Sequence, residues 1–322
     1  MNDFWQSLTQ EHTVHQSIDE PAQNYLMPLS QMGILTVTGD DASNFLQNLL
    51  TNDVKALVAN QSQLTGICTA KGRLLANFLL INTNDSYLLV LPKTMCASLK
   101  QRLSMYVLRS KVTISDSSDE VIAFGLYQNT PTMVAELPEQ EHQLSAANNA
   151  NFIKLPSQSK PRYLCLTTSD NAMELTQSLL EQDWIFAQEA NWNLLDINAG
   201  IPTIYSETKE KFTPQQVNFD LIGGVSFNKG CYPGQEIVAR LHYLGSPSRR
   251  MFSASSELSI ESDAGDEVTS AGGQVLGHIV TVQRCADNEM KLLLSLKLAE
   301  QEQQMFIAKT VTISNIVTLA ND

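Results

Sequence analysis

The segment 229–236 contains the residues whose types and spacing are best suited to chemistry. Cys231 lies two residues after Lys229 and just before Pro233-Gly234. This pair suits a type II turn, because proline fixes φ and glycine accepts a positive φ, and a helix can begin at Gln235. A nearby lysine and a helix N-terminus both stabilise a thiolate. Cys231 is therefore a candidate reactive or ligand-binding thiol, although a free cysteine is also often a small packed residue.

The charge of this region differs from that of the rest of the chain. The 322 residues carry a net charge of −13, but residues 205–250 contain six basic and four acidic residues, which leaves −15 elsewhere. An acidic surface repels phosphates and anionic membranes, so the composition argues against direct DNA binding and against general coating of nucleic acids. The basic strip is a candidate anion site, and a chance fluctuation on a solvated loop is the alternative.

Two further residues are candidates for ligand contacts. Trp192 has a flat ring that can stack on a planar heterocycle, and ordinary core packing is the other interpretation. Asp196, in the apolar stretch that follows, is either a polar ligand contact or a residue on a helix surface.

The five cysteines place limits on metal and redox chemistry. They are too far apart to form a CxxC pair, so we expect no metal site held by this chain. An odd number of scattered cysteines is typical of reduced thiols, and Cys68 and Cys165 lie in apolar strand patterns typical of the core. Residues 1–5 lack the features of a secretory signal, and the longest nearly apolar run, 74–81, is too short to span a membrane. We therefore expect a cytoplasmic protein that does not contact membranes.

The elements that must position these residues are read from hydrophobic periodicity. Residues 34–114 read as strand, helix, paired strands, helix and strand, the ferredoxin-like order of an α+β domain. Residues 121–127 and 163–167 resemble strands, 171–182 resembles a helix, and 136–159 is expected to be loop-rich. Short β runs beyond residue 250 predict a small barrel or sandwich. The expected domains are 1–118, 119–246 and 247–322.

The motifs together resemble a known family. Residues 229–236 read Lys-Gly-Cys-Tyr-Pro-Gly-Gln-Glu, with Gly-Gly-Val-Ser-Phe before them at 223–227 and Ile-Val-Ala-Arg after them at 237–240. This looks like the signature of the YgfZ folate-binding family, whose members are described as tRNA-modifying or iron–sulfur-maintenance proteins. The resemblance extends to residues 45–54, 70–73 and 199–202. The family is similar to the glycine-cleavage T-protein, an aminomethyltransferase that uses tetrahydrofolate.

The resemblance implies an α+β T-protein-like fold, with ferredoxin-like halves and a C-terminal β-barrel, that binds tetrahydrofolate or another folate. Trp192 matches a ring-contacting tryptophan of the family, whereas the second such tryptophan is replaced by Met32. The expected thiol site is Cys231 with Lys229 beside it, where Lys229 and the turn amides would hold anionic groups. The expected folate contacts are Trp192, Met32, Asp196, Tyr232, Gly234, Gln235, Glu236 and Arg240.

The chain departs from the T-protein at two positions. T-proteins carry an acidic pair where this chain has Ala76-Asn77, and an acidic residue where it has Cys231. These departures argue against the T-protein reaction, and the resemblance to the YgfZ family implies an accessory protein for iron–sulfur cluster assembly or repair. Such a protein would affect tRNA methylthiolation indirectly, with iron–sulfur proteins or assembly factors as partners. A folate-dependent aminomethyl- or methyltransferase is the alternative, a non-catalytic folate sensor is a third, and enzyme status stays open.

Overall fold

The computed structural model describes residue 5 and residues 12–131, 137–257, 260–285, 288–300 and 303–319. Residues 1–4, most of the N-terminal stretch used above to predict location, and Glu136, the start of the expected loop-rich segment, lie outside these ranges. No helix within them is long and apolar enough to cross a membrane.

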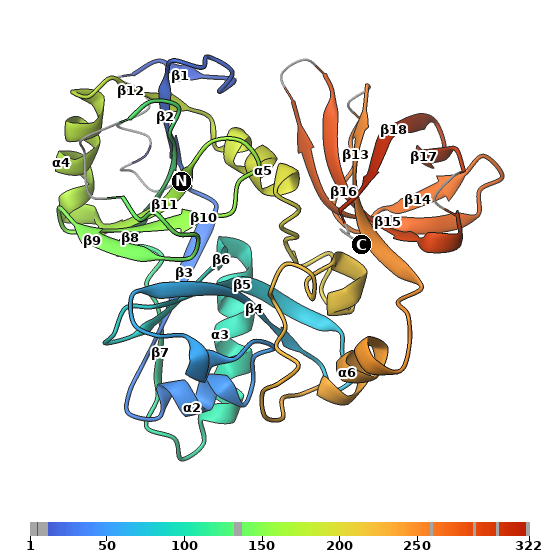
Figure 1. Ribbon diagram of the computed structural model, residues 1–322, viewed down its shortest axis with the longest axis horizontal. Helices are drawn as coiled ribbons and strands as arrows, with labels where there is room; N and C mark the ends of the chain where they lie inside the picture. Colours follow the sequence, from blue (N-terminus) through green and yellow to red (C-terminus); the bar gives the residue numbers. More distant parts are fainter. Residues whose placement is uncertain are drawn as a thin grey trace. The chain divides into compact units, whose positions relative to one another are not determined.

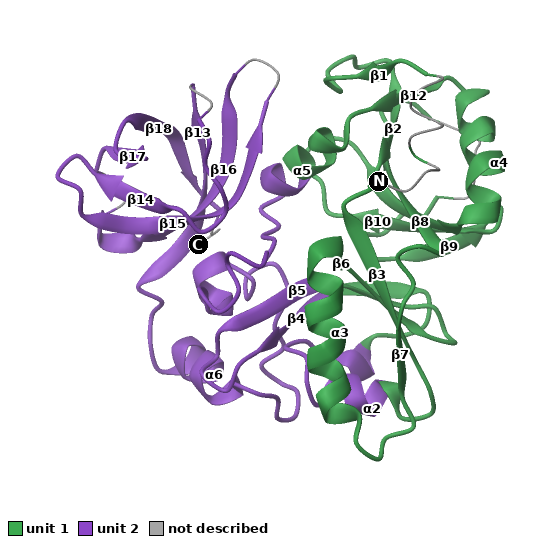
Figure 2. Ribbon diagram, turned by 180° about the vertical axis from the view of Figure 1, so that it is seen from behind, with its two compact units in different colours: residues 1–42, 57–63, 79–195 green, residues 43–56, 64–78, 196–322 purple. Residues whose placement is uncertain are grey.

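The chain divides into two compact units that are interleaved in sequence (Figure 2). Unit 1 comprises residues 1–42, 57–63 and 79–195, and unit 2 comprises residues 43–56, 64–78 and 196–322. The division differs from the three consecutive domains expected from the sequence, because the chain passes between the units several times. The signature segment 229–236 belongs to the same unit as the C-terminal strands.

Unit 1 contains a seven-stranded sheet in the order β1-β12-β2-β8-β11-β10-β9 (Figure 1). The strands are β1 (Val14–His15), β2 (Asn24–Pro28), β8 (Val121–Tyr127), β9 (Leu144–Ala147), β10 (Ala150–Leu155), β11 (Arg162–Thr168) and β12 (Trp184–Ala187). Helix α4 (Ser169–Leu180) packs on β8, β11 and β12. Its apolar side chains join a core that includes Phe124, Phe152 and Trp184.

A five-stranded sheet has the order β4-β5-β6-β3-β7. Its strands are β3 (Met32–Thr38), β4 (Gln61–Cys68), β5 (Leu74–Asn82), β6 (Tyr87–Pro92) and β7 (Thr113–Asp116). Residues 74–81 of β5 are all buried, which matches their almost continuous apolar sequence. Helix α3 (Lys93–Val107) packs on β3, β6 and β7 within unit 1. Another helix of residues 34–114, α2 (Ala42–Gln47), lies in unit 2 from Ser43 onward.

The C-terminal strands of unit 2 form a closed barrel in the order β13-β16-β15-β14-β17-β18, as the sequence predicts. They are β13 (Arg249–Ser256), β14 (Glu267–Ser270), β15 (Val275–Arg284), β16 (Met290–Lys297), β17 (Met305–Ile307) and β18 (Val311–Thr318). The other helices are α5 (Glu189–Asn198), α6 (Gln235–Tyr243), η1 (Val54–Ala56), η2 (Pro214–Val217) and η3 (Leu298–Glu300). In η2, which packs on β13 and β16, the Gln216 side chain accepts a hydrogen bond of 3.1 Å from the amide of Thr213.

The sheet pairing corrects one expectation about organisation and adds detail to another. Residues 1–118 are not one half, because β2 pairs with β12 and β8, which lie more than 90 residues later, while β3 belongs to the other sheet. Within its described part, the segment 136–159 is loop-rich as expected, but it also contains two strands that the sequence analysis did not predict, β9 and β10, which form a hairpin at the sheet edge. Both strands contain polar residues, and their period was therefore weak in the sequence.

Candidate functional site

The turn before α6 is formed as the sequence predicts. The amide of Gln235 donates a hydrogen bond of 3.1 Å to the carbonyl of Tyr232, which closes the turn around Pro233-Gly234. Gly234 adopts φ +83°, and α6 begins at the next residue. The glycine is therefore required by conformation, because an L side chain is strained at that φ.

This turn packs directly on a second turn, at residues 69–73. A Cβ on Gly234 would overlap the carbonyl oxygen of Thr69 and lie 2.8 Å from the Cα of Gly72. Gly72, with φ +69°, in turn faces Ile237 of α6, since its own Cβ would lie 3.0 Å from that of Ile237. The two turns therefore pack closely against each other at Gly234 and Gly72, where there is no room for a side chain.

The ammonium group of Lys229 is bound by three backbone carbonyls. Its Nζ donates to the oxygens of Gln47 and Leu50, both at 2.6 Å, and of Asn52 at 2.9 Å. Nζ also lies 5.3 Å from the centre of the Tyr232 ring. The side chain is buried. Burial lowers the pKa of Lys229 to about 8, and the nearby charge of Asp53 opposes that shift.

These contacts correct the expectation that Lys229 holds an anion. An ammonium group has three hydrogens, and three carbonyls already accept hydrogen bonds from it. Lys229 instead fixes the signature segment to the loop after α2, which lies almost 180 residues earlier. It is a positioning residue for the loop that carries Cys231.

The loop after α2 is itself held by side chains of two neighbouring residues. The Thr51 hydroxyl donates to the carbonyl of Gly224 at 2.7 Å and accepts from the amide of Gly66 at 2.9 Å. The Asn52 amide group donates to the carbonyl of Gly223 at 2.7 Å. The three motif regions at 45–54, 70–73 and 223–240 thus form one connected cluster within unit 2.

Cys231 is exposed, whereas Cys68, Cys96 and Cys165 are buried. The core placement expected for Cys68 and Cys165 is confirmed, and burial raises the pKa of the Cys68 thiol to about 12. Gly230, next to Cys231, is also exposed. It has no φ in the left-handed region, and a Cβ there would meet no described atom within 4 Å. Conformation and packing therefore do not require glycine at this position, unlike at Gly234.

The remaining predicted residues of unit 2 differ in their burial and contacts. Tyr232 is buried, and burial raises its pKa. The Gln235 side chain donates to the carbonyl of Lys229 at 3.3 Å, while Glu236 and Arg240 are exposed on α6. Asp196 is half-buried and lies near Tyr205. Burial raises the pKa of Tyr205, and the charge of Asp196 contributes to that rise. The predicted folate contacts at these positions stay predictions.

Trp192 lies on α5 in unit 1 and is only 1% exposed. Its ring packs on Gly125, because a Cβ added to Gly125 would lie 2.8 Å from Cζ3 of Trp192. The guanidinium carbon of Arg162 lies 4.9 Å from the centre of the Trp192 ring. The indole Nε1 is buried and has no hydrogen-bond partner among the described residues. An unsatisfied buried donor fits a ring ligand with acceptor atoms, although the groups covering the ring must move to admit one.

Met32, the counterpart of the second tryptophan, belongs to the same unit. Glu189, the first residue of α5, accepts hydrogen bonds from the Ser30 hydroxyl at 2.7 Å and from the Gln31 amide at 2.9 Å. These bonds hold the β2–β3 turn, and with it Met32, to the first turn of the helix that carries Trp192. Burial raises the pKa of Glu189, and the two hydrogen bonds oppose the rise.

Sequence reasoning missed Gly125, Arg162 and Glu189. A single glycine within the apolar run of β8 was a usable signal, because glycine inside a strand often marks a close approach. Arg162 is fully buried, and no local pattern in the sequence distinguishes it from an exposed arginine.

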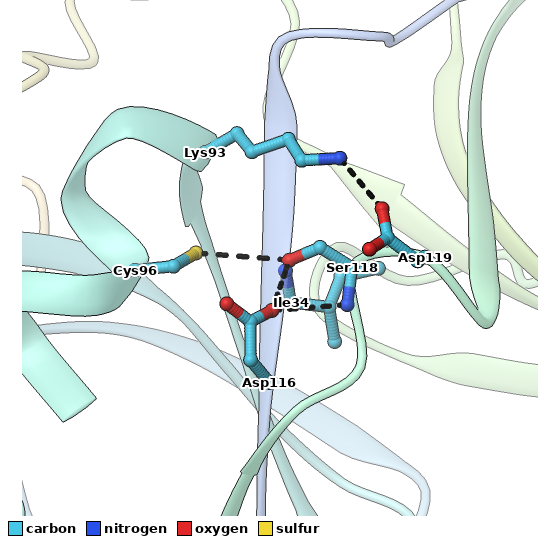
Figure 3. A network of polar contacts seen from close by, with 6 residues as sticks. All are labelled: Ile34, Lys93, Cys96, Asp116, Ser118 and Asp119. Carbon is cyan, nitrogen blue, oxygen red and sulfur yellow. Dashed lines mark hydrogen bonds and ion pairs between the residues drawn. The ribbon is translucent and has the colours of Figure 1, made fainter. Parts of the chain in front are cut away.

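A second polar network surrounds Cys96 in unit 1 (Figure 3). The Ser118 hydroxyl lies 2.5 Å from Asp116 Oδ1 and 3.9 Å from Cys96 Sγ, and it accepts from the Ile34 amide at 3.0 Å. Lys93 Nζ and Asp119 form an exposed ion pair of 2.9 Å beside it. Burial raises the pKa of Cys96 to about 11, so the thiol is neutral at pH 7. The network ties α3, β3 and the end of β7 together and is structural.

Comparison with known proteins places the chain in a family. The chain is 31% identical over 249 residues to the tRNA-modifying protein YgfZ of Yersinia pseudotuberculosis, with 76% of this chain and 74% of the relative covered. The chain belongs to the YgfZ family. The YgfZ protein of Colwellia psychrerythraea is 29% identical over 275 residues, covering 81% of this chain and 83% of that protein. Residues 7–128 match the GCVT N-terminal domain.

The T-protein-like fold expected from the sequence is confirmed. The structure resembles that of aminomethyltransferase T of the glycine cleavage system from Bartonella henselae, with a TM-score of 0.74 and 15% identity. The match covers 92% of this chain and 86% of that chain. At this identity the likeness establishes the fold only, so the chemistry has to be argued from the residues of the YgfZ-family chain.

Asn77, where T-proteins carry part of an acidic pair, has a structural task in this chain. It is buried, its Nδ2 donates to the carbonyl of Pro202 at 2.7 Å, and its Oδ1 accepts from the amide of Ile204 at 2.8 Å. Both ends of the side chain are engaged by backbone groups. An amide in this position cannot act as a carboxylate base.

Proposed function

We propose that this protein is a folate-binding accessory factor for iron–sulfur cluster assembly or repair, acting in the cytoplasm. Through iron–sulfur proteins or assembly factors it affects tRNA modification, in particular methylthiolation, and Cys231 is its functional thiol. Membership of a family whose curated members are named tRNA-modifying proteins supports the link to tRNA. The net charge of −13 favours an indirect link over general binding of RNA.

The observation that carries the role of the thiol is the contrast between Cys231 and its surroundings. Lys229, Tyr232 and Gly234 are all fixed by packing or hydrogen bonds. Cys231 is exposed between them, beside a glycine that packing does not require. A rigid frame that presents one exposed thiol is suited to contacting a sulfur, iron or one-carbon group on another molecule.

Folate binding rests on different residues. Trp192 supplies a planar ring and a buried indole N–H without a described acceptor, and Met32 is held at the start of the same helix through Glu189. Folate would supply one-carbon chemistry. The residues of this chain would orient its ring system and exclude water from it.

Two pairs of variants test these proposals separately. Trp192→Phe is compared with Trp184→Phe, since both tryptophans are buried in unit 1. We expect only Trp192→Phe to weaken tetrahydrofolate binding measured by calorimetry. Equal affinity in both variants would remove Trp192 from the site.

The thiol is tested in a strain that lacks the gene. Cys231→Ser is compared with Cys285→Ser, a half-buried cysteine of the barrel. We expect only Cys231→Ser to lower methylthiolated tRNA and the activity of iron–sulfur enzymes. Full restoration by Cys231→Ser would refute the role of the thiol.

The aminomethyltransferase alternative is tested on the purified protein. It requires turnover of tetrahydrofolate to a methylene form with an amine donor. The engaged amide of Asn77 argues against that reaction.

A further inference from the structure

Helix α6 leaves apolar side chains in solvent. Ten large hydrophobic residues are exposed in the described part of the chain, and three of them lie on or directly after this nine-residue helix. Ile237 is 40% exposed, Tyr243 61% and Leu244 84%, while Val238 is the residue that the helix buries. A helix of a globular protein normally buries its apolar stripe, and exposed apolar groups with a polar border often mark interaction sites.

Aromatic rings extend this surface towards Cys231. The Phe227 and His242 rings are stacked, with centres 3.7 Å apart and an angle of 9°. Tyr243 meets His242 edge-on at 4.7 Å. Because Phe227 precedes Cys231 by four residues and His242 is near the end of α6, the stack closes a loop that contains the exposed thiol. Rigid aromatic side chains are enriched among residues that dominate protein interfaces.

The border of this surface carries positive charge. Arg240 is exposed on α6 itself, and Lys71 is exposed in the turn whose Gly72 contacts Ile237. Residues 227–250 contain four basic residues and one acidic residue, Glu236, in a chain of net charge −13. Glu236 is also exposed on α6, so the exposed charges of Arg240, Lys71 and Glu236 sum to +1. Two of the four basic residues are engaged internally, since Lys229 binds carbonyls and Arg250 pairs with Asp220 at 2.7 Å. A partner surface with acidic residues around an apolar centre is complementary to this arrangement.

We propose that the side chains of Phe227, Ile237, His242, Tyr243 and Leu244, named the α6 surface, dock a protein partner whose contact face is apolar with an acidic border. This proposal rests on the proposed accessory function and gives the partner its chemistry. A protein fits better than RNA, because RNA binding depends on many phosphate contacts, and this border offers two exposed cations beside the exposed Glu236 in a chain of net charge −13. Docking there brings the partner to the exposed thiol of Cys231.

The test uses the full chain with two exposed residues changed to serine. The variant Tyr243→Ser/Leu244→Ser is compared with Met105→Ser/Met173→Ser, which alters two helix residues of unit 1 that are 62% and 48% exposed. Neither double variant is expected to change the melting temperature or tetrahydrofolate affinity. Truncation of interface centres weakens binding about tenfold or more. We therefore expect a deletion strain that expresses the first variant at a low level to lose methylthiolated tRNA, and a strain that expresses the second variant to keep it.

Crosslinking in cells identifies what touches the surface. A photoreactive residue at position 243 is expected to crosslink iron–sulfur proteins or their assembly factors, and one at position 105 is not. A product that ribonuclease removes would mean that RNA is the occupant, and a self-crosslink with a dimer in sedimentation would mean a second copy. Either result, or normal methylthiolation with Tyr243→Ser/Leu244→Ser, overturns the proposal. If Cys231→Ser still abolishes function in that case, the accessory function stands without the α6 surface.

Discussion

The contact between the two glycine turns gives a sharp prediction for Gly234→Ala. The substitution adds one methyl group to a residue with φ +83°, where an L side chain costs about 1–2 kcal/mol. The new Cβ would also overlap the Thr69 carbonyl and lie 2.8 Å from the Cα of Gly72, which are backbone atoms that cannot rotate away. Overpacking of this kind costs about 1–3 kcal/mol. The expected loss of stability at this contact is therefore about 2–5 kcal/mol.

Hydrogen exchange measures this loss where it occurs, independently of how the rest of the chain unfolds. The amides of Gly72, Gln235 and Val238 report on it, since they donate to Thr69, Tyr232 and Gly234 respectively. A loss of about 2 kcal/mol or more corresponds to exchange at least about 30-fold faster at these amides, if they open together.

Gly230→Ala is the matched control in the same motif. It has no left-handed φ, and no described atom lies within 4 Å of the added methyl group. We expect its exchange rates to stay within about twofold of the wild type, as for most surface substitutions. Wild-type exchange in Gly234→Ala would refute the packing of the two turns. Normal stability with lost methylthiolation in Gly230→Ala would instead indicate that another molecule approaches the backbone beside Cys231.

Three further predictions concern buried polar and packing groups. Burial lowers the pKa of Lys229 from 10.5 to about 8, so the unfolded state binds more protons between these values. The free energy of unfolding should rise from pH 8 to 10.5 by up to about 3 kcal/mol relative to Lys229→Met; parallel profiles would contradict this. Gly125→Ala should displace the Trp192 ring and cost about 1–3 kcal/mol, seen as altered fluorescence and a lower melting temperature, whereas an unchanged spectrum would count against the contact. Asn77→Asp removes the donor to Pro202 and buries a carboxylate, so it should destabilise by about 2–4 kcal/mol without creating aminomethyl transfer; new transfer activity would refute this.

Much of the signature segment could be predicted from local sequence. The Pro233-Gly234 turn and the helix from Gln235 follow from φ preferences and capping, which involve residues only a few positions apart. The barrel was expected from its four longest β runs, although β14 and β17 were missed because each is four residues or fewer. The family motifs themselves predicted the fold that the structure has.

The task of each site residue depended on contacts that local sequence does not encode. Lys229 was expected to face an anion, and only the fold brought three carbonyls around it from residues almost 180 positions earlier. The buried state of Trp192 likewise depends on Gly125 and Arg162, which other strands supply.

The sequence by itself identified the groups that are candidates for chemistry here, namely the thiol of Cys231 beside a glycine turn and the ring of Trp192. The T-protein-like fold was predicted from the resemblance of its motifs to the YgfZ family, not from their spacing alone. Tertiary structure decided which groups are already used by the protein. Partners that are distant in the sequence occupy hydrogen-bond donors and cover ring faces. Burial also changes the pKa values of titratable groups such as Lys229. For this reason Lys229 is a positioning residue, while Cys231, only two positions away, stays exposed.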